Sequence, residues 1–341
     1  MSAVKKDSCF FRIPIIHWVV FLCSSGIAYT QNLQVVDSVN TQSAFSSKTN
    51  QNEISYQKPS NNFYKTDSIF SFRSPKGYVP ALFHNFGAQA TAPFQFKTKQ
   101  WLITGAAIGI TAALICVDDD IDEWAQTQKQ KHNWVNRSSP VITEFGNRYG
   151  VYLVGAIGSF SAAFKKQKGV QTSLLATQAM ITSSVWVQLI KIITSRERPK
   201  AAYIYSQSEG GKWYGPFARF DNDLAWNKSG FAFNAFPSGH TAIAFSIATV
   251  FASQYNDTRA VPVLSYSAAT LVGISRLTEH EHWSSDVFIG ALMGYLCGKQ
   301  VVAHFNETHL KAITSLSSKP ENKAELSFFR NGNQIGLSLK W

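Results

Sequence analysis

The stretch SRLTEHEHWSSDVFIGALMGYLCGKQVVA, residues 275–303, indicates most directly what kind of fold the chain adopts. It opens with charged residues and histidines and becomes apolar from 285 onward, with glycine and alanine recurring. His282 and Asp286 are four residues apart, so a helix would place both on one face. Small residues let neighbouring helices approach closely. We therefore expect a tightly packed helix that carries polar chemistry at its start.

Six apolar stretches of this kind predict an all-α fold. They fall at about 101–117, 149–164, 171–194, 240–254, 261–275 and 285–303. Several are shorter than the roughly 20 residues that a membrane span needs, and the third is interrupted by glutamine and serine. We expect six helices packed around one core, in a single domain over 100–304.

Composition and charge narrow the possible functions. The chain has 341 residues, of which 45% are apolar and 16% are charged, and its formal net charge is +11. A basic excess suits an anionic partner, such as nucleic acid, a lipid headgroup or a phosphorylated substrate. The sequence contains no zinc-finger spacing, RNA-binding signature or basic helix, so we expect no nucleic-acid partner. Cys116 and Cys297 lie in apolar stretches, where buried free thiols are expected.

The N-terminal region is typical of an exported protein. A basic start, a mostly apolar stretch at 13–27 and small residues near 28 predict a secretory signal peptide over 1–28, with an uncleaved anchor helix as the alternative. Residues 29–99 are expected to form a polar linker and N-terminal extension. Within them, 31–62 contains few large apolar side chains, which predicts disorder. The remainder is expected to lie over the following domain.

The C-terminal tail, residues 305–341, has a different pattern. Apolar and polar residues alternate on both sides of Asn331-Gly332, and this dipeptide is a strong turn signal. The tail is therefore predicted to contain a short β-hairpin.

The first of three polar clusters, Lys191 with Arg198-Pro199, lies at the end of the third apolar stretch. A spacing of seven residues is two helical turns, so both cations would face one way. Pro199 disfavours helix at Arg198 and is expected to end the element there. Two cations that snorkel at a helix end would give the same pattern, so this cluster alone is ambiguous.

The second cluster, Pro237-Ser238-Gly239-His240, directly precedes the fourth apolar stretch. Ser238 is placed as an N-cap, and free N–H groups at a helix start bind anions. Gly239 would let a ligand approach the backbone closely. An ordinary capped helix with an incidental histidine is the alternative.

The third cluster consists of Ser275-Arg276, His282 and Asp286. Asp286 could hold the imidazole of His282 in one tautomer and leave the other ring nitrogen free to attack. Arg276 supplies a planar fork that suits phosphate oxygens. A purely structural histidine–aspartate pair is the alternative.

Together the clusters resemble the type 2 phosphatidic acid phosphatase (PAP2) superfamily, which also contains bacterial acid phosphatases and vanadium haloperoxidases. The order and the spacing both match: Lys191-x6-Arg198-Pro199, Pro237-Ser238-Gly239-His240 and Ser275-Arg276-x5-His282-x3-Asp286. The resemblance covers roughly 100–304 and implies a six-helix bundle of the PAP2/haloperoxidase type.

The resemblance implies a role for each motif residue. His282 would attack phosphorus and form a phosphohistidine, Asp286 would orient it, and His240 would protonate the leaving group. The remaining motif residues would bind the phosphate oxygens: Lys191, Arg198, Ser238, Gly239 and Arg276. No metal ion and no cofactor are expected.

The implied function is metal-independent hydrolysis of phosphate monoesters. A lipid phosphate such as phosphatidic acid, or a prenyl pyrophosphate, is favoured over a small soluble phosphomonoester. A vanadate-dependent haloperoxidase and a catalytically inactive envelope scaffold are the alternatives.

The expected location is the cell envelope of a bacterium. If all six helices crossed a membrane after a cleaved signal peptide, the segment 196–238 would be cytoplasmic, whereas the resemblance implies a periplasmic site. We therefore expect an exported, periplasmic domain whose helices pack on one another, with the basic segment 165–168 on anionic lipid. An integral membrane protein is the alternative.

Three further features are given structural interpretations. Glu279 and His280 match no motif position and are expected at the rim of the site. The acidic run Asp118-Asp119-Asp120 lacks the spacing of a calcium loop and is expected to be a solvated helix end. The aromatic-rich segment 200–236 is expected to form either a lid or leaving-group pocket, or an aromatic mini-core.

Overall fold

The computed structural model describes residues 75–218, 231–317, 325–331 and 334–340. The predicted signal peptide, the linker up to residue 74 and part of the segment 200–236 lie outside the described residues. The chain divides into two compact units, Met1–His304 and Phe305–Trp341.

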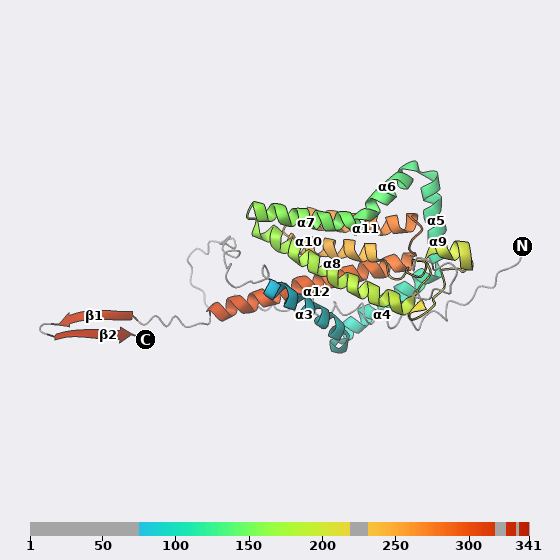
Figure 1. Cartoon of the computed structure of the whole chain (residues 1–341). Helices are drawn as coiled ribbons and strands as arrows, with labels where there is room; N and C mark the ends of the chain where they lie inside the picture. The colour runs from blue at the N-terminus through green and yellow to red at the C-terminus, as the bar shows by residue number, and fades with distance from the viewer. Residues whose placement is uncertain (1–74, 219–230, 318–324, 332–333, 341) are drawn as a thin grey trace, which may run out of the picture. The chain divides into compact units, whose positions relative to one another are not determined.

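The first unit is helical, which confirms the all-α prediction. The six expected helices correspond to α4, α7, α8, α10, α11 and α12, and Figure 1 shows α7, α8, α10, α11 and α12 running lengthwise beside one another. The long helices are α4 Thr98–Cys116, α7 Arg148–Ala163, α8 Gln167–Thr194, α10 Gly239–Gln254, α11 Ala260–Thr278 and α12 Ser284–Ser317. The other helical elements are α3 Pro75–Thr91, η5 Ala92–Gln95, α5 Asp118–Lys131, α6 Asn133–Thr143, η6 Glu144–Gly146, α9 Pro199–Ala201 and η7 Ala202–Ser206.

Close helix contacts place the starts of α10 and α12 side by side. α10 also packs against α8 and α11, and α7 packs against α8. A Cβ atom at Gly294 of α12 would lie 2.2 Å from the carbonyl oxygen of Ala242, and one at Gly290 would lie 2.4 Å from that of Ser238. Only glycine permits such an approach between two backbones. The glycines of α12 therefore fix the position of the segment that begins α10.

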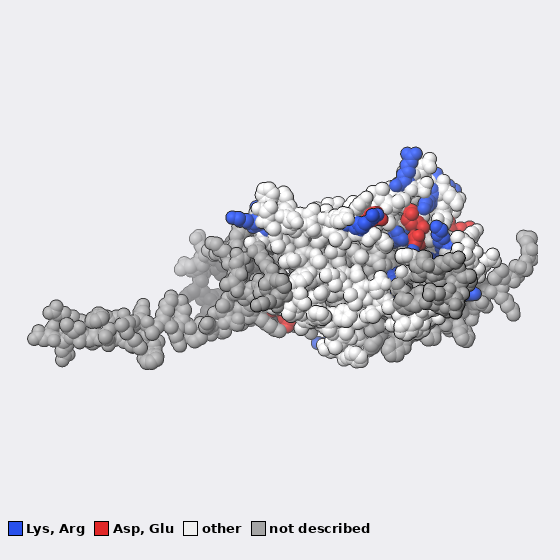
Figure 2. All heavy atoms as spheres, in the orientation of Figure 1, with Lys and Arg blue, Asp and Glu red and all other residues white. Residues whose placement is uncertain are grey.

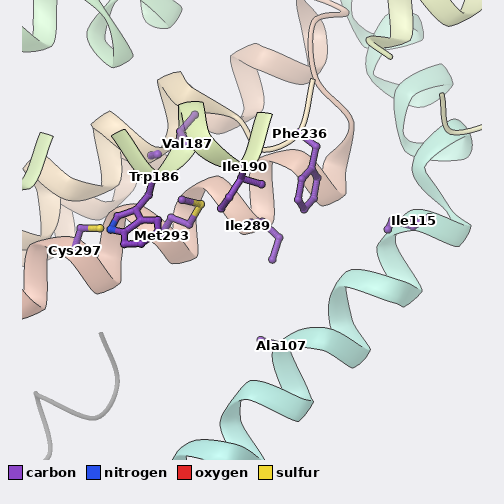
Figure 3. Close-up of a cluster of buried hydrophobic side chains, with 10 residues drawn as sticks. Ala107, Ile115, Trp186, Val187, Ile190, Phe236, Ile289, Met293 and Cys297 are labelled. Carbon is purple, nitrogen blue, oxygen red and sulfur yellow. The ribbon is translucent and has the colours of Figure 1, made fainter. Parts of the chain in front are cut away.

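The main hydrophobic core joins α8, α12 and the segment before α10. Figure 3 shows Trp186 and Ile190 of α8 beside Met293 of α12. Phe236, three residues before the start of α10, belongs to the same cluster and is fully buried. Burial of a phenylalanine side chain contributes roughly 1.5–3 kcal/mol, so this ring anchors the polar residues that follow it.

Buried amide side chains attach α3 to the bundle. Asn85 donates to the side-chain oxygen of Gln178 at 3.0 Å, and Gln89 donates to that of Gln300 at 2.9 Å. Trp186 donates to Gln89 at 2.8 Å. Gln178 of α8 and Gln300 of α12 thus find partners inside the protein, which removes the cost of placing these two side chains at membrane depth. Their presence is therefore no argument against a membrane-spanning helix.

Four helices are long and apolar enough to cross a membrane, judged by length and composition. They are Thr98–Cys116, Gln167–Thr194, Ala260–Thr278 and Ser284–Leu310. Each is longer than its predicted apolar stretch, because the polar turns at the helix ends were not counted. Figure 2 shows an almost uncharged surface along the middle of the bundle, with lysine and arginine gathered at its ends. Large apolar side chains such as Leu102 and Leu264 are exposed. These features support the alternative of an integral membrane protein.

The second unit contains the end of α12 and the predicted hairpin. β1 (Glu325–Asn331) and β2 (Gln334–Lys340) pair antiparallel, and Asn331 lies opposite Gln334. This register confirms the hairpin, although the turn at 332–333 lies outside the described residues. α12 continues to Ser317 instead of ending near 303. Of the two thiols expected to be buried, Cys297 is buried, whereas Cys116 is exposed.

Candidate active site

The three predicted clusters meet at one end of the bundle, which we call the site end. α8 ends there at Thr194 and α11 at Thr278, while α10 begins at Gly239 and α12 at Ser284. The backbone N–H of Ser238 donates to the carbonyl oxygen of Asp286 at 3.0 Å, which ties the second cluster to the third. The antiparallel packing of neighbouring helices thus assembles residues that are far apart in the sequence.

His282 is held as a neutral imidazole with one nitrogen available. The side chain is buried, and Nδ1 lies 2.7 Å from the carbonyl oxygen of Ala235. A carbonyl only accepts hydrogen bonds, so Nδ1 carries the proton and Nε2 keeps its lone pair. Burial, then the nearby Lys191 and Arg198, hold the pKa of His282 well below its ordinary value. The ring is therefore oriented and uncharged, which a nucleophile requires.

Asp286 lies beside His282 but is bound mainly by other groups. Its Oδ2 is 3.7 Å from Nδ1 of His282, so Ala235, and not Asp286, is the hydrogen-bond partner of the ring. Oδ2 accepts the backbone N–H of Trp283 at 2.8 Å, and Oδ1 accepts Arg196 at 2.6 Å. Asp286 lies beside the ring at the expected i, i+4 spacing, but it does not make the direct hydrogen bond that would fix the tautomer of His282.

Arg196 and Asp118 are functional candidates that the sequence analysis missed. Both are fully buried, and Arg196 donates to Asp118 at 2.7 Å. Asp118 also accepts the hydroxyl of Ser284 at 2.6 Å and the N–H of Ser285 at 3.0 Å, at the start of α12. The interpretation of Asp118 as a solvated helix end is therefore wrong. Arg196, the first of the two arginines in the segment SRERP (195–199), lies between Lys191 and Arg198 in the sequence and was the available signal.

The cationic side of the site consists of Lys191, Arg198 and Arg276. Arg276 is buried and donates to the hydroxyl of Thr143 at 2.9 Å, and Lys191 donates to the carbonyl of Asn234. Burial, followed by the charge of Arg276, lowers the pKa of Arg198 to about 10, so it is still cationic at neutral pH. The Nε atoms of both arginines are buried and have no hydrogen-bond partner among the described residues. Buried donors of this kind fit an anionic ligand.

The start of α10 supplies the anion-binding end of a helix. Ser238 is the N-cap residue, but its hydroxyl pairs with that of Thr241 at 2.8 Å and makes no bond to the helix backbone. The first N–H groups of the helix are therefore not used by the cap. A Cβ atom at Gly239 would meet only Val187, at 3.5 Å, so packing alone does not require glycine there. Close approach of a ligand is the remaining reason.

His240 lies in the same electrostatic field as His282. Burial, followed by the charges of Arg276 and Lys191 as the second and third causes, lowers the pKa of His240 to about 3. The ring is neutral in the unliganded site. A phosphate dianion would offset the cations, so its binding should raise the pKa of His240 and draw a proton onto the ring.

The rim residues lie where they were expected. Glu279 accepts Lys129 of α5 at 3.1 Å, and Nδ1 of His280 lies 3.0 Å from a carboxylate oxygen of Asp122. Among the described parts of the segment 200–236, Trp213 stacks 4.8 Å from the guanidinium of Arg196. The ring of Trp213 also lies 5.0 Å from that of Phe236, which fits an aromatic mini-core in the described parts, whereas residues 219–230 lie outside the described chain.

Comparison with known proteins places the chain in a family. The sequence profile of the PAP2 superfamily matches residues 172–309, a range that contains all eight predicted site residues. The segment 172–309 belongs to the PAP2 superfamily. Within the described part of this PAP2 chain, no group of three or more His, Cys, Asp or Glu side chains could hold a metal ion. Asp118 and Thr143 precede the matched range.

Two relatives were found. Over 71 residues the chain is 45% identical to a Lipid A 1-phosphatase of Porphyromonas gingivalis, a match that covers 20% of this chain and 16% of that protein. The chain is also similar to the crystal structure of a transmembrane PAP2 type phosphatidylglycerolphosphate phosphatase from Bacillus subtilis. The TM-score is 0.40 and the identity 21%, over 59% of this chain and 94% of that one.

Proposed function

We propose that this PAP2 protein is a metal-independent phosphatase that hydrolyses phosphate monoesters through a phosphohistidine on His282. The observation that carries the proposal is the convergence of two neutral imidazoles with three cations. The unpartnered Nε donors of Arg198 and Arg276 support an oxyanion as the ligand.

In the first half-reaction, Nε2 of His282 attacks phosphorus while the bond from phosphorus to the ester oxygen breaks. His240, protonated as the phosphate binds, gives its proton to the leaving alkoxide. In the second half-reaction, His240 takes a proton from water, the oxygen of which attacks phosphorus and releases inorganic phosphate from His282. Lys191, Arg198 and Arg276 stabilise the negative charge that the phosphoryl group carries throughout.

A lipid phosphate is the favoured substrate class. The exposed apolar side chains and the four span-capable helices would keep the site at a membrane surface. The relative from Porphyromonas gingivalis is a Lipid A 1-phosphatase, and its matched segment supports the same substrate class here.

The first prediction concerns metal dependence. The purified protein is expected to release phosphate from phosphatidic acid, a prenyl pyrophosphate and p-nitrophenyl phosphate in excess chelator, with vanadate as a competitive inhibitor. The reason is that arginine, lysine and helix N–H groups replace the metal as the source of positive charge. Phosphate release is measured with and without chelator. Activity that disappears in chelator and returns with magnesium or zinc would contradict the proposal.

The proposed orientation places the site end on the periplasmic side of the membrane. The opposite end holds the short connections 164–166 and 255–259. These connections and the first residues of α8 carry the lysines of 165–168 and Arg259, and the one acidic residue among them is Asp257. Short cytoplasmic loops carry an excess of lysine and arginine. In this orientation α4 begins on the cytoplasmic side of the membrane. A cleaved signal peptide would export the segment that precedes α4, so the two are incompatible.

The second prediction tests this orientation. Lys131→Cys at the site end and Lys166→Cys at the opposite end are made in a chain whose native cysteines are replaced by serine. In intact spheroplasts, a membrane-impermeant maleimide is expected to label Lys131→Cys and not Lys166→Cys. After permeabilisation, it is expected to label Lys166→Cys as well. Labelling of both variants without permeabilisation would show a wholly exported domain, and labelling of Lys166→Cys alone would show the inverted orientation.

A further inference from the structure

Glu281 places a carboxylate between the two arginines of the site. Its Oε2 contacts Arg198 and lies 3.7 Å from a terminal nitrogen of Arg276. The backbone N–H of Glu281 donates to the carbonyl of Arg276 at 3.2 Å, which fixes the residue next to His282. One carboxylate oxygen thus lies where an oxygen of a bound phosphate would meet both guanidinium groups.

This carboxylate satisfies the arginines only in part. The Nε atoms of Arg198 and Arg276 still lack hydrogen-bond partners among the described residues. A phosphate monoester has three non-bridging oxygens and a larger charge, so it can engage more of these donors than one carboxylate can. The side chain of Glu281 is 29% exposed, which leaves it room to move away toward solvent.

Glu281 differs in this respect from its neighbour on the rim. Glu279 has the same charge and lies two residues away, but its carboxylate pairs with Lys129 of α5 at 3.1 Å. Proximity to the site therefore does not by itself explain the contact of Glu281 with both arginines.

We propose that Glu281 is an internal competing anion, which occupies the two-arginine subsite in the free protein and is displaced by phosphate. The effect of Glu281 on catalysis rests on the proposed phosphatase function. Substrate has to displace the carboxylate on entry, and its return favours release of inorganic phosphate. The residue therefore weakens binding of substrate and product alike, and it keeps the enzyme from being held by its own product.

The third prediction compares Glu281→Gln with the matched control Glu279→Gln in the full chain, purified in detergent. The neutral amide of Glu281→Gln no longer competes for the arginines. The KM for p-nitrophenyl phosphate and the Ki of inorganic phosphate are both expected to fall about tenfold, or ~1.4 kcal/mol. Both constants are expected to stay within about twofold for Glu279→Gln, a change of roughly 0.4 kcal/mol. Unchanged constants for Glu281→Gln would overturn the proposal, and raised ones would make Glu281 a residue that positions the arginines.

Calorimetric titration with inorganic phosphate separates this inference from the proposed function. If the unmodified protein binds phosphate but hydrolyses no ester, the proposed function fails, and tighter phosphate binding by Glu281→Gln still supports the competing carboxylate. Equal or weaker binding by Glu281→Gln rejects it, whatever the activity. Glu281→Asp, whose shorter side chain cannot reach both arginines, is expected to lower the Ki as well and serves if the first variant does not fold.

Discussion

Replacement of His282 with alanine is expected to abolish turnover and to prevent transfer of a labelled phosphoryl group to the protein. The backbone carbonyl of Ala235 accepts a hydrogen bond from Nδ1 of His282, which leaves Nε2, the other nitrogen of the same ring, available to attack phosphorus. Removal of a covalent nucleophile costs on the order of 10⁴–10⁶ in kcat. Turnover of p-nitrophenyl phosphate and rapid-quench labelling with a phosphorus-labelled substrate measure the two effects.

His240→Ala is expected to behave differently, because the proposed mechanism uses the two histidines at different stages. A nitrophenyl leaving group needs little help from an acid, so the first half-reaction should survive in part. The attack of water on phosphohistidine would lack its base, which slows that step by about 10²–10⁴. The phosphorylated protein should therefore accumulate, with acid-labile, base-stable label on His282.

His280→Asn is the matched control for both variants. His280 is a rim histidine with a left-handed backbone, φ 59°, that pairs with Asp122 and not with the cationic cluster. Asparagine tolerates this backbone conformation, so turnover should stay near that of the unmodified protein. If His282→Ala still labels while His240→Ala does not, the two roles are reversed. If neither variant loses turnover, the site does not catalyse the reaction.

Local spacing made the motif residues predictable, because each cluster lies at a helix boundary that the sequence itself marks. The expected end at Arg198 is wrong, because α8 ends at Thr194 and Pro199 begins the short helix α9, so Lys191 and Arg198 do not share one helix. Ser238 is the N-cap residue of α10, and His282 and Asp286 are four residues apart at the start of α12. Antiparallel packing then brings these boundaries together, which follows from six helices joined in a bundle. The fold class, and the location of the predicted site residues near helix boundaries, were therefore accessible without coordinates.

Long-range pairing was not predictable in the same way. Asp118 and Arg196 are 78 residues apart, and nothing in the acidic run at 118–120 distinguishes the buried member from its exposed neighbours. Gln178 of α8 misled for a similar reason, because a polar residue in an apolar stretch argued against a membrane-spanning helix. Its partners, Asn85 and the carbonyl of Tyr78, are on α3, in a segment that was expected to be part of a linker and extension.

Glu281 illustrates a further limit of motif-based interpretation. It lies between two motif positions, Arg276 and His282, and matches neither. Its significance comes from the direction of its side chain, which a left-handed residue at 280 helps to determine by turning the chain after α11. Only the assembled geometry distinguishes it from Glu279.

The buried pair of Asp118 and Arg196 is expected to be the largest contributor to stability among the polar contacts near the site. Arg196 is fully buried, lies over Trp213 and Trp283, and donates to the carboxylates of both Asp118 and Asp286. Asp118→Ala would leave the guanidinium with a single carboxylate and would remove the acceptor at the start of α12. Breaking a buried ion pair by removing one partner costs about 3–5 kcal/mol.

The loss is expected to reach the site because Arg196 also holds Asp286. With Asp118 absent, the guanidinium can shift toward other acceptors such as the carbonyl of Gly210, which it already contacts at 2.7 Å. Asp286 and the neighbouring His282 would then be less firmly placed, so kcat should fall by about tenfold or more. Asp120→Ala is the control, because it removes the same charge from an exposed position two residues along the same helix. Thermal unfolding in detergent and kcat for p-nitrophenyl phosphate are measured for both variants. If Asp118→Ala lowers stability no further than Asp120→Ala, the buried pair does not support the site, and the start of α12 is held by its packing against α10 alone.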